Sequence, residues 1–285
     1  MGKKSRRKGS VTKDRATKRM PFVARTFGGL PGEGDWIALR EFVPSGTADV
    51  SLTDGTVVRV CSRLPGNGAA IRRPDGQTWL GLQVQHNFGD ISRDLAHLVE
   101  TANDVEPGNP VPVTDPGVGP RLQDLVDPSS TFDVEVHEGF DFWVEGTEAE
   151  GSEAIAAANE SVPPTERLSS VDAAYWTRMG DRRYLRWVVT EDESAVLNAF
   201  ARLHEVDADR VGDGTRLIGM FRAHGLLVPV WEMDPDVVSD GADLLQEPVS
   251  ALRRRLDDAL ADTSDLTSEQ RSVRNGLASR QVTIR

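Results

Sequence analysis

Four side chains between residues 133 and 141 have types and spacing that suit metal chemistry. Asp133, Glu135 and His137 alternate along one predicted strand, and Asp141 lies on the strand that we expect to return beside it. A three-residue loop at 137–139 sets Glu135 directly opposite Asp141, a like-charge pair that is normally unfavourable. A hard divalent cation would relieve this repulsion, because Mg²⁺ and Ca²⁺ use oxygen ligands. Alternatively, these residues form a solvated outer face of an acidic protein.

If the protein is an enzyme, metal-assisted hydrolysis at these four residues is therefore the version to test. Several other enzyme classes need a catalytic or phosphate-binding lysine that the chain cannot supply. Every lysine lies within the first 18 positions, so residues 19–285 contain no lysine for a P-loop, a protein kinase site or a Schiff base. Arginine cannot replace it there, because its guanidinium does not deprotonate. We exclude these three enzyme classes.

Other short motifs also give no support for catalysis. The chain has no GxSxG elbow and no HExxH spacing, and the loop that begins at Asp207 and Asp209 lacks the two ligands that close a calcium-binding EF-hand. Cys61 lies at the end of a predicted strand, where a small core residue is the simplest interpretation. The sequence thus favours a non-enzymatic protein, and it predicts no cofactor.

The N-terminal segment is the strongest functional clue. Residues 1–19 hold nine basic side chains against one acidic, a formal charge of +8, whereas the remaining 24 basic and 44 acidic side chains give −20. Such an arm would contact the phosphates of RNA, the ribosome or DNA without sequence preference. Alternatively it is a solubilising tail, and the rest of the chain is a protein-interaction module. The cationic residues of the arm are Lys3, Lys4, Arg6, Arg7, Lys8, Lys13, Arg15, Lys18 and Arg19.

Composition indicates a cytoplasmic protein. A single cysteine cannot form an internal disulfide and fits a reducing compartment. No apolar run approaches the roughly 18 residues that a membrane span needs, and residues 9–18 are too polar for a signal peptide. We therefore expect no membrane contact, and a protein partner is possible.

Turn chemistry predicts a strand-rich first domain over residues 21–104. Asp35 is a suitable N-cap for a short helix over 36–42. Asp54-Gly55 and Pro74-Asp75-Gly76 each separate two alternating segments, which predicts two hairpins in a four-stranded meander. The apolar spacing from Ile91 to Ala102 then predicts an amphipathic helix.

The chain between residues 105 and 130 holds six prolines, which predicts an interdomain linker. We expect a second α+β domain over 131–240. It would begin with a hairpin at 132–145 and include helices near 149–159, at 191–203 behind a Thr190 cap and at 217–224. It would also hold strands at 184–189 and 226–232.

The last segment, 241–285, is predicted to be helical, with Thr267 and Gln270 capping its final helix. The predicted class is therefore α+β: a disordered basic arm over 1–20, two small domains with antiparallel-rich sheets and amphipathic helices, and a helical C-terminus.

A resemblance supports this view. The chain opens with Met-Gly-Lys-Lys-Ser-Arg-Arg-Lys and continues from Pro21 to Pro44 as PFVARTFGGLPGEGDWIALREFVP. This opening resembles an actinobacterial family of unknown function, whose members have sometimes been labelled as topoisomerase or as SecA-related. The residues here fit neither label, because the chain beyond Lys18 has no lysine to bind ATP and a single cysteine cannot form a multi-cysteine zinc knuckle. The resemblance implies a cytoplasmic setting and carries over no catalytic residue.

Overall fold

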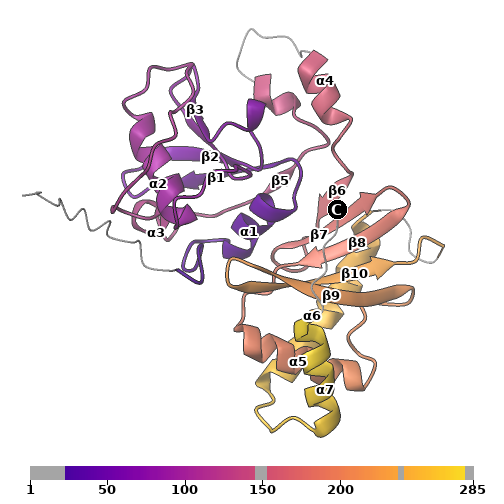
Figure 1. Cartoon of the computed structure of the whole chain (residues 1–285). Helices are drawn as coiled ribbons and strands as arrows, with labels where there is room; N and C mark the ends of the chain where they lie inside the picture. The colour runs from indigo at the N-terminus through magenta and orange to yellow at the C-terminus, as the bar shows by residue number, and fades with distance from the viewer. Residues whose placement is uncertain (1–22, 145–152, 237–240, 280–285) are drawn as a thin grey trace, which may run out of the picture.

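The computed structural model describes residues 23–144, 153–236 and 241–279. These residues form two five-stranded, antiparallel-rich sheets with helices packed on them (Figure 1). The expected α+β class is therefore confirmed. No helix in the described ranges is long and apolar enough to cross a membrane. The basic arm falls outside these ranges.

The first sheet has the strand order β3-β4-β2-β1-β5. Both hairpin turns formed as expected, but the meander is wrong, because β4 runs parallel to β2 and inserts beside it. A short crossover through η1 makes this possible. The elements are α1 (Glu33–Glu41), β1 (Gly46–Ser51), β2 (Val57–Cys61), η1 (Pro65–Asn67), β3 (Ala70–Arg72) and β4 (Thr78–Gly81).

The strand β5 (Glu135–Val136) completes this first sheet instead of opening a second one. Val136 pairs with Gly46, and residues 141–144 form the 3-10 helix η2 (Asp141–Val144). The hairpin predicted over 132–145 is therefore wrong. Phe140 and Phe142 are buried in a small core with Trp79, so the chain turns into that core rather than returning beside β5.

The proline-rich segment packs against the first sheet. Val111 is buried and donates its backbone N–H to Ala70, and α3 (Leu122–Leu125) contacts α2 (Ile91–Ala102), the predicted amphipathic helix. Two of its proline carbonyls accept hydrogen bonds from buried Arg93. The two sheets consequently divide between β5 and β6, after the segment that we expected to separate them. The domain limits themselves stay a prediction.

The second sheet has the order β6-β7-β8-β10-β9. Residues 217–224 were expected to be a helix, but residues 217–223 belong to β9 and His224 lies in the turn that follows it. One extra residue, Ile218, bulges where Gly219 pairs with Val230 and Leu217 with Trp231, so Leu217 and Met220 face the same core at a helix-like spacing. The elements are α4 (Glu153–Asn159), β6 (Thr165–Arg167), β7 (Ala174–Met179), β8 (Arg182–Trp187), α5 (Glu193–Glu205), β9 (Thr215–Ala223) and β10 (Leu226–Met233).

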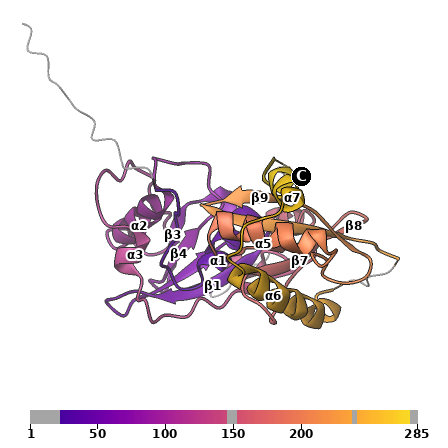
Figure 2. The same ribbon diagram turned by 90° about the horizontal axis from the view of Figure 1, so that it is seen from below.

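The C-terminal helices cover this second sheet. Figure 2 shows α5, α6 (Gln246–Ala261) and α7 (Ser268–Ser279) together on one side of it, with η3 (Asp243–Leu245) leading into α6. Apolar residues of the three helices share one core with Trp187 and Trp231. The predicted cap is confirmed, since Thr267 and Gln270 exchange side chain-to-backbone hydrogen bonds. At α5 the N-cap is Asp192, not Thr190.

A polar contact and an apolar core join the two sheets. Asp35 is not the N-cap of α1, a position that Gly32 takes. Its buried carboxylate instead accepts hydrogen bonds from Tyr175 and Arg167 of the second sheet. Around these groups one core contains α1 residues together with Tyr175 and residues of β10. The two sheets therefore pack against each other through a buried interface, called the seam below, that consists of Asp35, Arg167, Tyr175 and this apolar core.

Candidate functional site

The structure does not gather the four predicted metal-binding residues. Asp133 and Glu135 are exposed, and His137 contacts the hydroxyl of Thr47 through Nε2 at 2.8 Å. The carboxylate of Asp141 accepts instead from Asn159, because η2 replaces the strand that would have placed it opposite Glu135. Within the described ranges no group of three or more His, Cys, Asp or Glu side chains is placed to hold a metal ion.

The nine predicted nucleic-acid-binding residues, from Lys3 to Arg19, lie outside the described residues. The segment that follows the arm is described and is held firmly at the seam. Phe27 is fully buried and stacks on Trp36, and the backbone carbonyl of Thr26 accepts from Arg121 and Gln123. The arm is thus attached to the folded part through an anchored segment.

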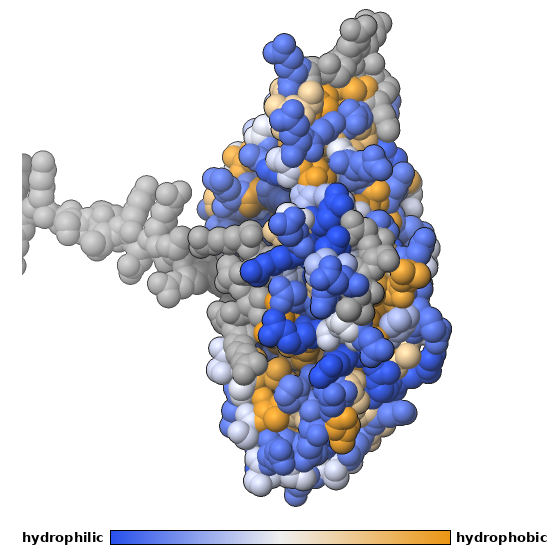
Figure 3. Space-filling view, turned by 90° about the vertical axis from the view of Figure 1, so that its right-hand side faces the viewer, coloured by the Kyte–Doolittle hydropathy of each residue, from blue (hydrophilic) through white to orange (hydrophobic). Residues whose placement is uncertain are grey.

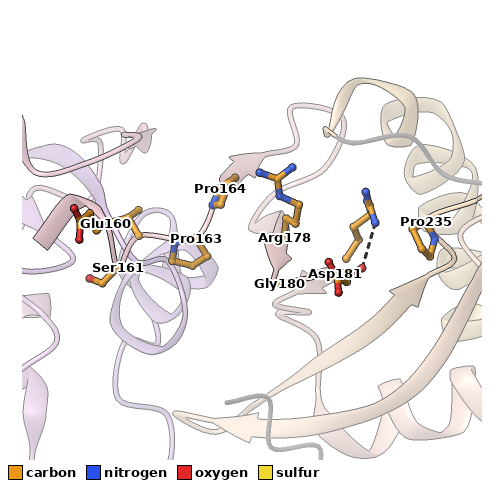
Figure 4. A pocket seen from close by; sticks show the side chains of 10 residues that line it. Glu160, Ser161, Pro163, Pro164, Arg178, Gly180, Asp181 and Pro235 are labelled. Carbon is orange, nitrogen blue, oxygen red and sulfur yellow. Dashed lines mark hydrogen bonds between the residues drawn. The ribbon is translucent and has the colours of Figure 1, made fainter. Parts of the chain in front are cut away.

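A cleft of about 760 Å³ lies where the connection from the first sheet meets the β7–β8 turn. One wall is the segment 160–164, and the other is formed by residues of the turn together with Pro235. Figure 4 shows Pro163 and Pro164 on one side and Arg178, Gly180 and Asp181 on the other. Proline fixes its own φ, so this wall is stiff and the cleft is largely preformed.

Two arginines give this cleft its chemical character. Arg178 on β7 is the direct cross-strand partner of Arg183 on β8, and both line the cleft. Each of the two side chains also has a further interaction of its own, and the acidic Glu160 and Asp181 line the same cleft. Arg183 also donates to the backbone carbonyl of Asp181 at 3.3 Å. The cleft is therefore polar, with charged side chains of both signs in its walls.

The surface seen from the right-hand side of Figure 1 is mainly polar. The most hydrophilic residues gather in the middle of this face, and apolar residues form separate small patches around them (Figure 3). Beside the cleft, Arg182 and Arg216 both pair with Glu232, at 3.6 and 2.8 Å. This face accordingly suits charged ligands better than an apolar partner.

Several other arginines of the folded part serve internal contacts. Buried Arg186 donates to the carbonyl of Phe42, at the C-terminal end of α1 where helix carbonyls carry partial negative charge. Burial lowers the pKa of its guanidinium to about 10. Arg121 pairs with buried Asp90 at 2.6 Å, and Arg255 donates to two backbone carbonyls. These cations hold the fold together.

Cys61 is not a nucleophile. It is fully buried in the small core beside Trp79, and burial raises the pKa of its thiol well above the usual range. A thiolate is the reactive form, so this cysteine is inert in the folded protein. Its expected role as a small core residue is confirmed.

One family model matches residues 26–285, which is nearly the whole folded part. The chain belongs to DUF5926, a family of unknown function. The match begins at Thr26, directly in the anchored segment, so the DUF5926 match covers the cleft and the seam but not the basic arm. Searches of curated proteins and of solved structures found no match.

Proposed function

We propose that this DUF5926 protein is a non-enzymatic adaptor of the cytoplasm. Residues 1–19 would contact the phosphates of RNA, the ribosome or DNA, and the acidic folded part would be carried to that polyanion. The observation behind the proposal is the separation of charge, +8 on the arm against −20 on the rest of the chain. The body alone would be repelled by a polyanion, whereas the arm would be attracted.

The internal contacts of arginines in the folded part support the proposal that the arm, and not the folded part, binds phosphate. Three guanidinium groups of the folded part donate hydrogen bonds to buried carboxylates or backbone carbonyls, those of Arg93, Arg121 and Arg186. Such groups cannot turn outward without leaving buried acceptors unpaired. The arm has only Asp14 as an acidic neighbour within its own sequence. Attraction to phosphate would therefore come chiefly from the arm.

The salt dependence of binding gives a number to test. If about six of the arm's positive charges contact phosphates, a plot of the logarithm of the binding constant against the logarithm of salt concentration has a slope of about −5 on duplex DNA. The slope on single strands is shallower. Little sequence preference is expected, because the arm has no aromatic side chain to stack on bases.

The decisive experiment measures retention on RNA, ribosomes and DNA at two salt concentrations. The full chain is compared with a 20–285 truncation and with a variant in which Lys3, Lys4, Arg6, Arg7 and Lys8 are changed to Gln. The control variant changes exposed body arginines instead, Arg182 and Arg254. We expect both arm variants to lose binding and the control to keep it. Equal retention of all four proteins would reduce the arm to a solubilising tail.

A further inference from the structure

A histidine at the end of α5 is held by a buried carboxylate. Nδ1 of His204 lies 2.6 Å from Oδ2 of Asp209. The Asp209 side chain is only 5% exposed, whereas that of His204 is 52% exposed. A buried carboxylate requires a hydrogen-bond donor, so Nδ1 carries a proton and Nε2 is the nitrogen left for another group. The imidazole is thereby fixed in orientation with one ring edge accessible.

The loop that presents Asp209 is fixed from two further elements. Trp231 of β10 donates its indole N–H to the Asp209 carbonyl at 2.8 Å. Arg255 of α6 donates to the carbonyls of Ala208 and Arg210, at 3.1 and 2.7 Å. Backbone on both sides of the carboxylate is therefore immobilised. Preorganised support of this kind is typical of side chains that bind ligands.

A cavity of about 480 Å³ opens beside this histidine. Arg210 and Arg216 line it together with His204 and Asp209, and Leu217 and Ile218 supply an apolar wall. Asp207, which also lines it, pairs with Arg210 at 2.9 Å.

Within the described residues, both arginines are held by ion pairs in which the guanidinium is largely exposed. The side chains of Arg210 and Arg216 are 55% and 75% exposed in their pairs with Asp207 and Glu232. Exposed pairs of this kind contribute little to stability, so either guanidinium can turn to a ligand at little cost.

We propose that this cavity binds the oxyanion group, phosphate or carboxylate, of a small ligand. Arg210 and Arg216 contribute charge-assisted hydrogen bonds, and the fixed His204 ring, in its doubly protonated form, donates its Nε2–H to the same oxyanion. The apolar wall at Leu217 and Ile218 accommodates the remainder of the ligand.

Two other roles for this cavity fit less well. A metal site would need more ligands than His204 and a carboxylate already bonded to it, and no such group occurs in the described part of the chain. Covalent catalysis of the serine or cysteine type would need a hydroxyl or a thiol, and none of the residues that line the cavity carries one. Oxyanion binding uses the two guanidinium groups and the imidazole that line the cavity. The site lies apart from the arm and from the Arg178–Arg183 cleft, so it goes beyond the adaptor function.

Calorimetry on the full chain tests the proposal, with pyrophosphate and succinate as separate probes. Heat with pyrophosphate alone assigns a phosphate ligand, and heat with succinate alone assigns a carboxylate. His204→Gln and Arg216→Gln should each weaken binding about tenfold or more, the usual cost of a lost charge-assisted hydrogen bond. His97→Gln is the matched control, because His97 is also helical and bonds only a threonine hydroxyl, that of Thr114. The absence of heat with both probes would overturn the proposal.

A second readout guards against variants that fail to fold. Long-range ¹H–¹⁵N spectra of the imidazoles in the wild-type chain should show Nε2 of His204 shifting on ligand addition while the His97 nitrogens stay fixed. The arm variant described above should bind the probe as wild type does, which separates this proposal from the adaptor function. Ligand heat that is equal in wild type, His204→Gln and Arg216→Gln would also contradict it.

Discussion

Replacing Asp35 with Asn tests the contact that joins the two sheets. Its side chain is 4% exposed and receives two bonds from Arg167, at 2.9 and 3.2 Å, and one from the Tyr175 hydroxyl at 2.5 Å. Burial and the adjacent Asp35 carboxylate raise the pKa of the Tyr175 phenol well above its usual range. The phenol therefore stays protonated and continues to donate.

The expected loss of stability follows from burial. Removing one partner of a buried ion pair costs about 3–5 kcal/mol. Arg167 is 27% exposed and recovers part of this through water, and the Asn side chain still accepts from Tyr175. We therefore expect Asp35→Asn to lower the free energy of unfolding by about 2–3 kcal/mol.

Urea unfolding followed by tryptophan fluorescence measures this loss, because Trp36 is buried next to Asp35. The matched control is Asp49→Asn, which breaks an equally bidentate pair with Arg59 on the surface, where the Asp49 side chain is 46% exposed. That change should cost less than about 1 kcal/mol. If the two variants shift the urea midpoint equally, burial does not set the strength of the seam contact and the reasoning is refuted.

Three further outcomes are expected. Cys61 should resist a thiol reagent until the protein unfolds, and rapid labelling of native protein would contradict its burial. A hydrogen bond from His224 lowers the pKa of Glu41, so the stability from Glu41 is present above the ordinary glutamate pKa of about 4.3 and is lost as pH falls through the lower folded value. In acid melts, the stability gap between wild type and Glu41→Gln should therefore narrow; a constant gap would be a contrary result. Gly225→Ala should destabilise more than Gly29→Ala, because both have positive φ but a Cβ at Gly225 would lie 2.4 Å from a backbone carbonyl oxygen, whereas at Gly29 nothing lies within 4 Å. Equal thermal melting of the two glycine variants would show that the collision is relieved.

Local signals in the sequence predicted local structure well. The turns at Asp54-Gly55 and Pro74-Asp75-Gly76 formed their hairpins, and the Thr267–Gln270 cap is in place. Each of these needs only residues within a few positions of one another. The parallel insertion of β4 and the addition of β5 to the first sheet depend on partners far away in the chain, so turn chemistry alone did not predict them.

The other predictions that the structure contradicts failed for specific physical reasons. The bulge at Ile218 gave β9 a helical spacing, so periodicity predicted the wrong element. Asp35 has the residue type of a cap, but its real partners are more than 130 positions later. The metal cluster depended on a hairpin register that the Phe140 core excludes.

The site residues that the sequence reasoning missed are Asp209 with His204 and the Arg178–Arg183 pair. His204 and Asp209 meet only because the chain reverses after α5, where Asp207 has a φ of 56°. A histidine five positions before an aspartate is too common a pattern to single them out. The arginine pair follows from strand β7, which sequence periodicity did not identify; the Gly180-Asp181 turn was the signal that could have revealed it.

The anchoring of the arm has a consequence during synthesis. Thr26, at the root of the arm, contacts His224, which is 198 positions later. At about 5–20 residues per second, roughly 10–40 s pass before the ribosome has made that partner. The cationic arm therefore leaves the exit tunnel before this last contact of its anchor exists, and the first phosphates within its reach are those of the ribosome that is making it.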